Sequence, residues 1–372
     1  MTPVQEIDAK RSRIAEFLDQ NGLDAVLLTR RANFAWLTAG CVNHVGQASE
    51  IGNATLVATC DGIQCVANTI ESPRMRAEEL QDRNIEVVEF AWFDTQDAAR
   101  VWADVVGGRK AAADVILPGM PGHVVPLPAA FHELRWQLCE PEMRRYRTLG
   151  TAVGAGLQEV CRQIQPGMTE LEIAAALAAR LNREGIRTPV LLVAADERID
   201  RYRHPLPTPR RIDSRVMAVV SAERAGLFCS ATRLVSFGPV PPGSRHRHDA
   251  VVRVDASLIA ATRPGRTLGE IFRTAQRSYA EAGYPDEWKR HHQGGSTGYL
   301  GREVRADPSC NVAVVPNQAF AWNPSIGGTK SEDTILVTDS GTEILTQGVD
   351  WPMIDVCVDG HTLRRPDILT WA

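Results

Sequence analysis

The chain has 372 residues, of which 44% are hydrophobic and 23% are charged, and its formal net charge is −4. This size and composition are typical of a globular protein with room for two domains, and they give no electrostatic basis for binding nucleic acid or an anionic membrane. No apolar run approaches the roughly 20 residues of a membrane span. The N-terminus is polar, and the eight cysteines lack metal-finger spacing. We therefore expect a reduced, cytoplasmic protein with buried free thiols.

Helix and strand signals alternate along the first 122 residues, which predicts an α/β domain. Thr2 and Pro3 begin a helix over residues 3–20, and Asp61-Gly62 marks a hairpin. The strands expected here cover residues 23–29, 54–60, 63–69 and 85–90, and the helices cover 73–82 and 95–106. A proline-rich segment and a helix over 131–138 follow. We place the first domain at residues 1–138 and the second at 139–372.

The second domain mixes paired helices with antiparallel strands. The expected helices cover residues 142–164, 169–184, 247–262 and 267–282. The expected strands cover residues 190–194, 216–221, 228–237, 311–315, 319–321, 334–338 and 343–346.

This domain contains an internal repeat. The segment 166–173 (Pro-Gly-Met-Thr-Glu-Leu-Glu-Ile) returns as 264–271 (Pro-Gly-Arg-Thr-Leu-Gly-Glu-Ile), and each copy runs as a helix to a glycine. Thr169 and Thr267 can each cap a helix, with a glutamate three residues on to complete a capping box. The repeat predicts two similar halves about a pseudo-twofold axis, with polar residues converging between them. Two unrelated helices that begin alike are the alternative.

Four polar windows of the second domain are candidate sites: residues 203–208, 229–233, 291–303 and 322–334. Two prolines follow His204 and hold its backbone. Arg233 lies in an apolar strand and needs a partner if it is buried. The glycines after His291 and His292 let a ligand approach the backbone closely. Each window also has an ordinary interpretation, such as a loop histidine or a surface salt-bridging turn.

In their order and spacing, these windows resemble the creatinase/aminopeptidase P/methionine aminopeptidase family. The resemblance implies an α+β fold, with a C-terminal pita-bread domain that carries the pseudo-twofold duplication. It also implies a smaller N-terminal α/β domain of the creatinase type.

Peptidases of this family bind two divalent metals through Asp, Asp, His, Glu and Glu. At three of these positions the chain has Ser230, Gly295 and Asn323, and the strand around residues 218–221 has no carboxylate. Only Glu332 is retained. A catalytic metal generally needs about three protein ligands, so we expect no catalytic metal at this position and no cofactor. The chain is identified as a member with a depleted metal site that resembles creatinase and ectoine hydrolase.

The resemblance therefore implies a metal-independent hydrolase of a C–N bond, amide or amidine-like, in a small molecule, and we expect that molecule to carry a carboxylate. The catalytic candidates are His204 as general acid/base, Glu332 as base or nucleophile, and His291 and His292 as groups that polarise the carbonyl. The candidates for substrate binding are Arg233, Arg302, Glu303, Asn323, Lys330, Ser230, Tyr299 and Trp322.

Three alternatives stay open at this stage. The chain could be a non-catalytic pita-bread binding protein, a metal-dependent Xaa-Pro-type aminopeptidase whose ligands are misplaced in our comparison, or a lyase on the same scaffold. The expected partner is a small-molecule substrate, with no nucleic acid and no membrane. The resemblance also implies a homodimer in which the N-terminal domain contributes to the partner's cleft.

Overall fold

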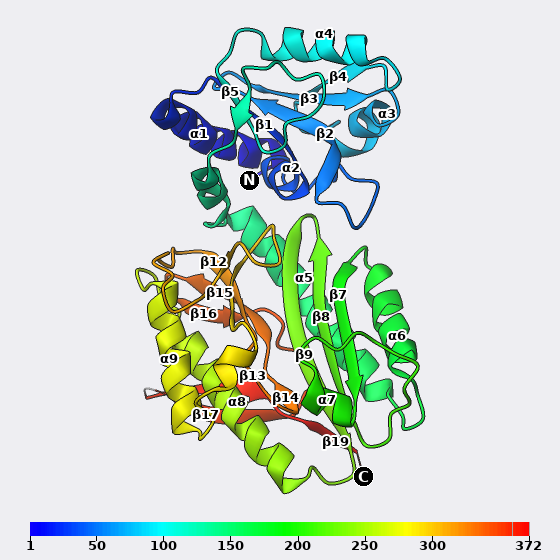
Figure 1. The fold of residues 1–372 in the computed structure, drawn as a ribbon, viewed down its shortest axis with the longest axis vertical. Helices are drawn as coiled ribbons and strands as arrows, with labels where there is room; N and C mark the ends of the chain where they lie inside the picture. The colour runs from blue at the N-terminus through cyan, green and yellow to red at the C-terminus, as the bar shows by residue number, and fades with distance from the viewer. Residues whose placement is uncertain (359, 372) are drawn as a thin grey trace. The chain divides into compact units, whose positions relative to one another are not determined.

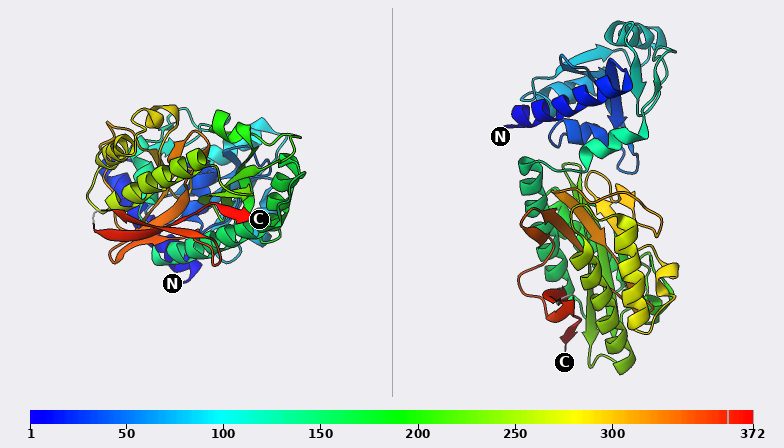
Figure 2. Two further views of the ribbon diagram at one scale, coloured as in Figure 1. Left: turned by 90° about the horizontal axis from the view of Figure 1, so that it is seen from below. Right: turned by 90° about the vertical axis from the view of Figure 1, so that its left-hand side faces the viewer.

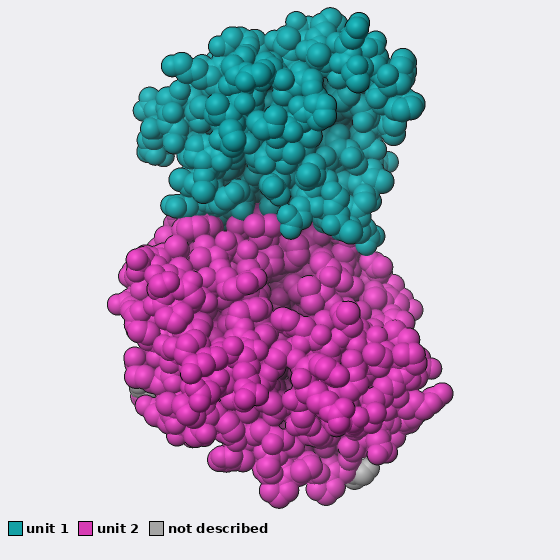
Figure 3. Space-filling view, viewed as in Figure 1, with its two compact units in different colours: residues 1–135, 225–227 teal, residues 136–224, 228–372 magenta. Residues whose placement is uncertain are grey.

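The structure is a computed structural model that describes residues 1–358 and 360–371. The chain divides into two compact units (Figure 3). The first contains Met1–Arg135 and Ala225–Leu227, and the second contains Trp136–Arg224 and Phe228–Ala372. The expected division into domains 1–138 and 139–372 stays a prediction.

The N-terminal unit has one sheet of mixed direction in the order β4-β3-β2-β1-β5-β6 (Figure 1). Its strands are β1 (Ala25–Arg30), β2 (Ile51–Ala58), β3 (Ile63–Asn68), β4 (Glu86–Phe90), β5 (Ala111–Ala113) and β6 (Val125–Pro126). Its helical segments are α1 (Pro3–Asn21), α2 (Arg31–Leu37), α3 (Ser72–Arg74), η1 (Met75–Glu79), α4 (Thr95–Val106) and η2 (Ala129–Arg135). Trp102 and Val106 of α4 pack on this sheet with Leu27 and Val66. The unit is the α/β arrangement that the alternating signals predict.

The C-terminal unit contains a four-stranded sheet, β19-β9-β8-β7, and a five-stranded sheet, β11-β10-β12-β15-β16. Long helices accompany each sheet (Figure 2). The first set of elements is α5 (Glu140–Gln163), α6 (Glu170–Asn182), β7 (Arg187–Ala195), α7 (Glu197–Arg201), β8 (Arg215–Arg224) and β9 (Leu227–Phe237). The second set is α8 (Pro242–Ala261), α9 (Leu268–Glu281), η3 (Glu287–Arg290), β10 (Gly294–Thr297), β11 (Val304–Arg305) and β12 (Gln318–Trp322). The remaining strands are β13 (Ser325–Ile326), β14 (Thr329–Lys330), β15 (Asp333–Thr338), β16 (Gly341–Ile344), β17 (Met353–Val358), β18 (His361–Pro366) and β19 (Leu369–Trp371).

The sequence repeat forms the same structure twice. Thr169 accepts a hydrogen bond from the N–H of Glu172 at the start of α6, and Thr267 accepts the equivalent bond from the N–H of Glu270 at the start of α9. Each threonine also makes an isolated antiparallel bridge to a later segment, at Arg211 and at Ala313. The duplication therefore includes the helix starts and the backbone that they contact.

Several expected elements differ in the structure. The helix expected over residues 73–82 is short and continues as a π-helical turn. The strand expected over 311–315 is reduced to the bridge at Ala313. The cysteines are free, but Cys60 and Cys357 are exposed rather than buried. Across residues 1–358 and 360–371, every helix is too short or too polar to cross a lipid bilayer.

Candidate functional site

Three histidines from two separate windows meet in the C-terminal unit. His204 follows α7, whereas His291 and His292 lie between η3 and β10. The Nε2 atoms of His204 and His291 are 3.0 Å apart. The ring of His292 lies 4.6 Å from that of His291 and 5.8 Å from that of His204, measured between centroids. We call these residues the histidine trio.

Glu332 lies buried beside two cationic side chains. Its Oε2 is 3.4 Å from the Nζ of Lys330, and its Oε1 is 3.6 Å from a terminal nitrogen of Arg302. Thr232 on β9 donates its hydroxyl to the same carboxylate at 2.7 Å. Lys330 and Glu332 come from the segment around β14, Arg302 from the loop after β10, and Thr232 from β9 of the four-stranded sheet. The fold thus gathers three of the four predicted windows around one carboxylate.

Burial keeps the imidazoles of the trio neutral. It is the main cause that lowers the pKa of all three rings, and that of His292 falls to about 3. The positive charge of Lys330 lowers the pKa of all three rings further, and that of Arg302 lowers the pKa of His204 and of His292. Burial also lowers the pKa of Lys330, and Glu332 opposes that effect. The trio therefore offers unprotonated ring nitrogens at neutral pH, next to excess positive charge.

Several predicted substrate-binding residues are already bonded to the protein. Arg233 donates to Asp333 and to the Thr346 carbonyl, at 3.0 Å and 2.9 Å. The hydroxyl of Tyr299 donates to Glu142, and Glu303 accepts from the backbone N–H of Tyr299. These side chains therefore have a structural role.

Trp322, Ser230 and Asn323 are also buried. Trp322 stacks on Phe320 and donates its indole N–H to Thr262 at 3.0 Å. Ser230 donates to the hydroxyl of Ser221 at 3.1 Å, whereas the side-chain oxygen of Asn323 is buried without a hydrogen-bond partner. Trp322 therefore belongs to the core, and Asn323 keeps an unused acceptor.

The sequence analysis missed two positioning side chains. Thr232 bonds Glu332, and the hydroxyl of Ser325 lies 3.2 Å from the Nδ1 of His291. Thr232 directly precedes Arg233 in the candidate window 229–233, so the sequence pattern could have identified it. Ser325 could not have been identified from the sequence, because a serine after Asn-Pro is typical of any turn.

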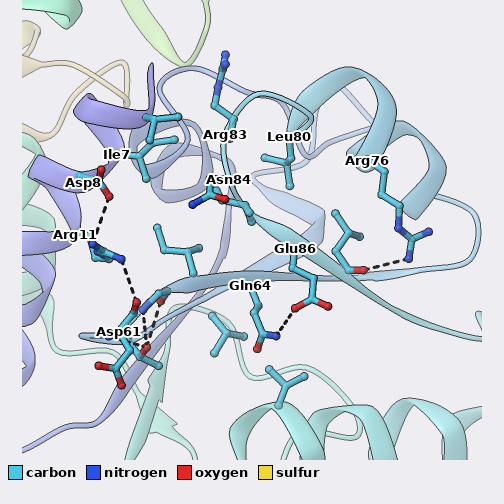
Figure 4. A pocket seen from close by; sticks show the side chains of 18 of the residues that line it. Ile7, Asp8, Arg11, Asp61, Gln64, Arg76, Leu80, Arg83, Asn84 and Glu86 are labelled. Carbon is cyan, nitrogen blue, oxygen red and sulfur yellow. Dashed lines mark hydrogen bonds and ion pairs between the residues drawn. The ribbon is translucent and has the colours of Figure 1, made fainter. Parts of the chain in front are cut away.

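A separate cleft of about 850 Å³ lies in the N-terminal unit. Ile7 and Arg11 of α1, Asp61, Gln64 and Glu86 are among the side chains that line it (Figure 4). Arg11 of α1 donates to the backbone carbonyl of Asp61 at 3.1 Å, whereas the ion pair of Arg11 with Asp8 lies within α1 and the hydrogen bond of Gln64 to Glu86 joins neighbouring strands. The cleft contains none of the predicted site residues.

The sequence profile of metallopeptidase family M24 matches residues 144–339, more than half of the chain and the whole region that holds the site. The chain belongs to family M24. The expected membership in the creatinase/aminopeptidase P group is therefore confirmed.

The relatives and the solved structures agree with this membership. An Xaa-Pro dipeptidase of Pyrococcus horikoshii is 22% identical over 369 residues, which cover 92% of this chain and 97% of that protein. A probable dipeptidase PepE of Mycobacterium bovis is 25% identical over 67% of this chain and 72% of its own length. The structure of an Xaa-Pro dipeptidase from Bacillus anthracis superposes with a TM-score of 0.78 at 16% identity, covering 98% of this chain and 100% of that one. The expected pita-bread fold with an N-terminal α/β domain is confirmed.

These M24 relatives correct the expected function. Our first interpretation was a metal-independent hydrolase of an amide or amidine-like C–N bond in a small molecule, and it is wrong in its metal independence and its substrate class. The relatives that match along most of the chain are named as Xaa-Pro dipeptidase and dipeptidase, in a family of metallopeptidases. They favour the alternative of an Xaa-Pro-type peptidase. That interpretation relied on the missing ligands of the M24 metal set and gave less weight to the similarity along the rest of the chain.

The two-metal ligand set of M24 peptidases nevertheless does not fit the residues present here. A Cβ built on Gly295, where we place the M24 histidine, would lie 2.1 Å from the carbonyl oxygen of Val304. The backbone thus leaves no room for any side chain at that position. Glu332, the one retained carboxylate, is flanked by Lys330 and Arg302. These residues therefore cannot hold the dinuclear centre of M24 peptidases.

Proposed function

We propose that this protein hydrolyses the peptide bond of a short peptide, of the Xaa-Pro dipeptide type, at the site around Glu332. The proposal rests on one observation: Glu332, Lys330 and Arg302 lie together and interact electrostatically with His204 of the histidine trio, inside the region that matches family M24. The names of the relatives support the substrate class.

The charges at the site suit a substrate with a free carboxylate. Two cationic side chains flank the single carboxylate of Glu332, so one positive charge remains for a ligand. The Nε of Arg302 is buried without a hydrogen-bond partner. A guanidinium with a free donor is well suited to hold a carboxylate by charge-assisted hydrogen bonds. Arg302 and Lys330 would therefore select dipeptides over peptides with a blocked C-terminus.

Glu332 is the residue that we expect to handle the proton. Its carboxylate can orient a water molecule and accept a proton from it, and Thr232 fixes the orientation of one oxygen. His204 is the exposed member of the trio and is the one that an incoming substrate reaches first. The dimeric state and the cytoplasmic location stay predictions.

A substrate panel tests the proposal. Purified protein is incubated with Ala-Pro, Ala-Ala and Ala-Pro-amide, with and without added Mn²⁺, Co²⁺ or Zn²⁺, and free proline or alanine is measured. We expect release of proline from Ala-Pro, with weaker activity on Ala-Ala and on the blocked peptide. Absence of hydrolysis of all three peptides under every condition would refute the proposal and favour the non-catalytic binding protein.

A further inference from the structure

We propose that His204, His291 and His292 together bind one divalent transition-metal ion, with Zn²⁺ as the preferred ion. This site differs from the Asp, Asp, His, Glu, Glu set, none of whose expected positions contributes to it. Binding of the ion stands on the geometry of the trio alone. Only a role for the ion in hydrolysis would rest on the proposed function.

The distances within the trio suit a single ion. One ring nitrogen from each histidine lies within 4.8 Å of the other two. Two nitrogens that bind one tetrahedral Zn²⁺ at about 2.0–2.1 Å are about 3.3 Å apart. The Nε2 atoms of His204 and His291 are 3.0 Å apart, so a small outward shift opens the required space.

The hydrogen bonds of the trio are incomplete without a ligand. A proton shared between the Nε2 atoms of His204 and His291 satisfies that pair. The Nδ1 of His292, however, is buried and has no hydrogen-bond partner. Buried polar atoms are paired in most proteins, and an exception points to an ion or another ligand. This orphaned nitrogen is independent of the contact between the other two rings.

The surroundings hold the rings as metal sites require. Ser325 bonds the Nδ1 of His291 from outside the cluster, which orients the ring and directs Nε2 to the other rings. Pro205 restricts the backbone after His204. Because His204 is exposed and His291 is buried, the trio opens to solvent on one side. Three protein ligands with an open fourth position are typical of a catalytic rather than a structural zinc site.

The ligand chemistry selects the class of ion. Three neutral imidazoles favour Zn²⁺ and similar ions over Mg²⁺ and Ca²⁺, which prefer oxygen ligands. Lys330 and Arg302 add positive charge nearby, which opposes ions bound mainly by electrostatic attraction. The same charges favour an anionic fourth ligand, such as hydroxide or a carboxylate.

Titration with Co²⁺ and Zn²⁺ tests the site without measuring activity. After treatment with a chelator and dialysis, the wild-type protein is titrated with Co²⁺, whose visible absorption reports tetrahedral coordination, and Zn²⁺ is then added in competition. We expect one ion per chain, displaced by Zn²⁺. The variants His291→Ala and His292→Ala should each weaken Co²⁺ binding by about 100-fold or more. The variant His246→Ala, which alters an exposed histidine outside the trio, should bind as the wild type does.

The outcomes separate the site from the proposed function. Circular dichroism and thermal melts of each variant establish that it is folded. Failure of the wild type to bind a stoichiometric ion, or unchanged binding in folded His291→Ala and His292→Ala variants, would overturn the metal site. Stoichiometric binding in a protein that cleaves no peptide would uphold the site and refute only the proposed function.

Discussion

Gly295 has a backbone conformation and surroundings that no other residue fits. Its φ is 151°, and an added Cβ would also lie 2.9 Å from the backbone nitrogen of Ala306. The close packing arises because β10 pairs with β11 on one side and with β12 on the other. The resemblance placed an expected metal ligand here, and this geometry explains why the chain cannot have one.

We predict that Gly295→Ala destabilises the protein by about 2–4 kcal/mol, because the backbone of β10 and β11 must separate to admit the methyl group. The free energy of unfolding in urea measures the effect. Gly301→Ala is the control, since its Cβ would make only an ordinary contact of 3.7 Å with Phe228. Equal stability of the two variants would show that β11 does not pack closely against the Cα of Gly295.

The sequence pointed to the polar side chains that lie together at the site, but it did not predict which residues they form hydrogen bonds and ion pairs with. His204, His291, Lys330 and Glu332 were all named from their windows, because charged and imidazole groups near glycine and proline stand out in an apolar chain. Arg233 was named for the same reason, but its partner Asp333 is 100 positions away in the chain. A single sequence does not reveal such a pairing, so it could not separate a structural arginine from one that binds substrate.

Among the elements, those with their own end signals were predicted best. The helix expected over 95–106 matches α4, whose N-cap Asp94 bonds the next turn. In contrast, α2 was missed because it follows β1 directly, and its N-cap residue, Arg30, makes no side-chain capping hydrogen bond. The pair β17 and β18 was also missed, since most residues of β17 are only partly buried or exposed and form no apolar run.

The duplicated helix starts make a prediction at this scale. Thr169→Ala and Thr267→Ala should each lower the free energy of unfolding by about 1 kcal/mol, because each removes the acceptor for a backbone N–H at a helix N-terminus. The two losses should be similar. Thr274→Ala, within α9, is the control and should change stability little, since alanine favours the helix. If both cap variants match the control in urea unfolding, the matched caps contribute nothing.

For the whole molecule, His248, the least exposed histidine among those whose burial the structure describes, links stability to pH. His248 on α8 is 1% exposed, lies 2.7 Å from the hydroxyl of Thr329 and 3.2 Å from the carbonyl of Pro366. Burial, aided by the charge of Arg245, lowers the pKa of His248 to about 4. The unfolded chain therefore binds this proton more tightly than the folded chain does.

We predict that stability falls as the pH drops from about 6.5 toward 4, by up to about 3 kcal/mol from His248. In that window the unfolded state is protonated at His248 while the folded state is not. Unfolding free energies of the wild type and of His248→Gln, measured at several pH values, should differ less at pH 5 than at pH 7.5. The exposed residue His246, changed to Gln, should leave the pH dependence of the wild type intact. A constant difference between wild type and His248→Gln would contradict the assignment.

The central claim is that Glu332 accepts the proton when a substrate peptide bond is hydrolysed. The kcat/KM of the variant Glu332→Gln on Ala-Pro tests this claim most directly. Glutamine keeps the shape of the side chain but cannot accept the proton, so we predict a loss of about 100-fold or more. Glu343→Gln, which changes a half-exposed glutamate that pairs with Arg147 on the surface, should retain wild-type activity. Wild-type kcat/KM in folded Glu332→Gln would contradict the account.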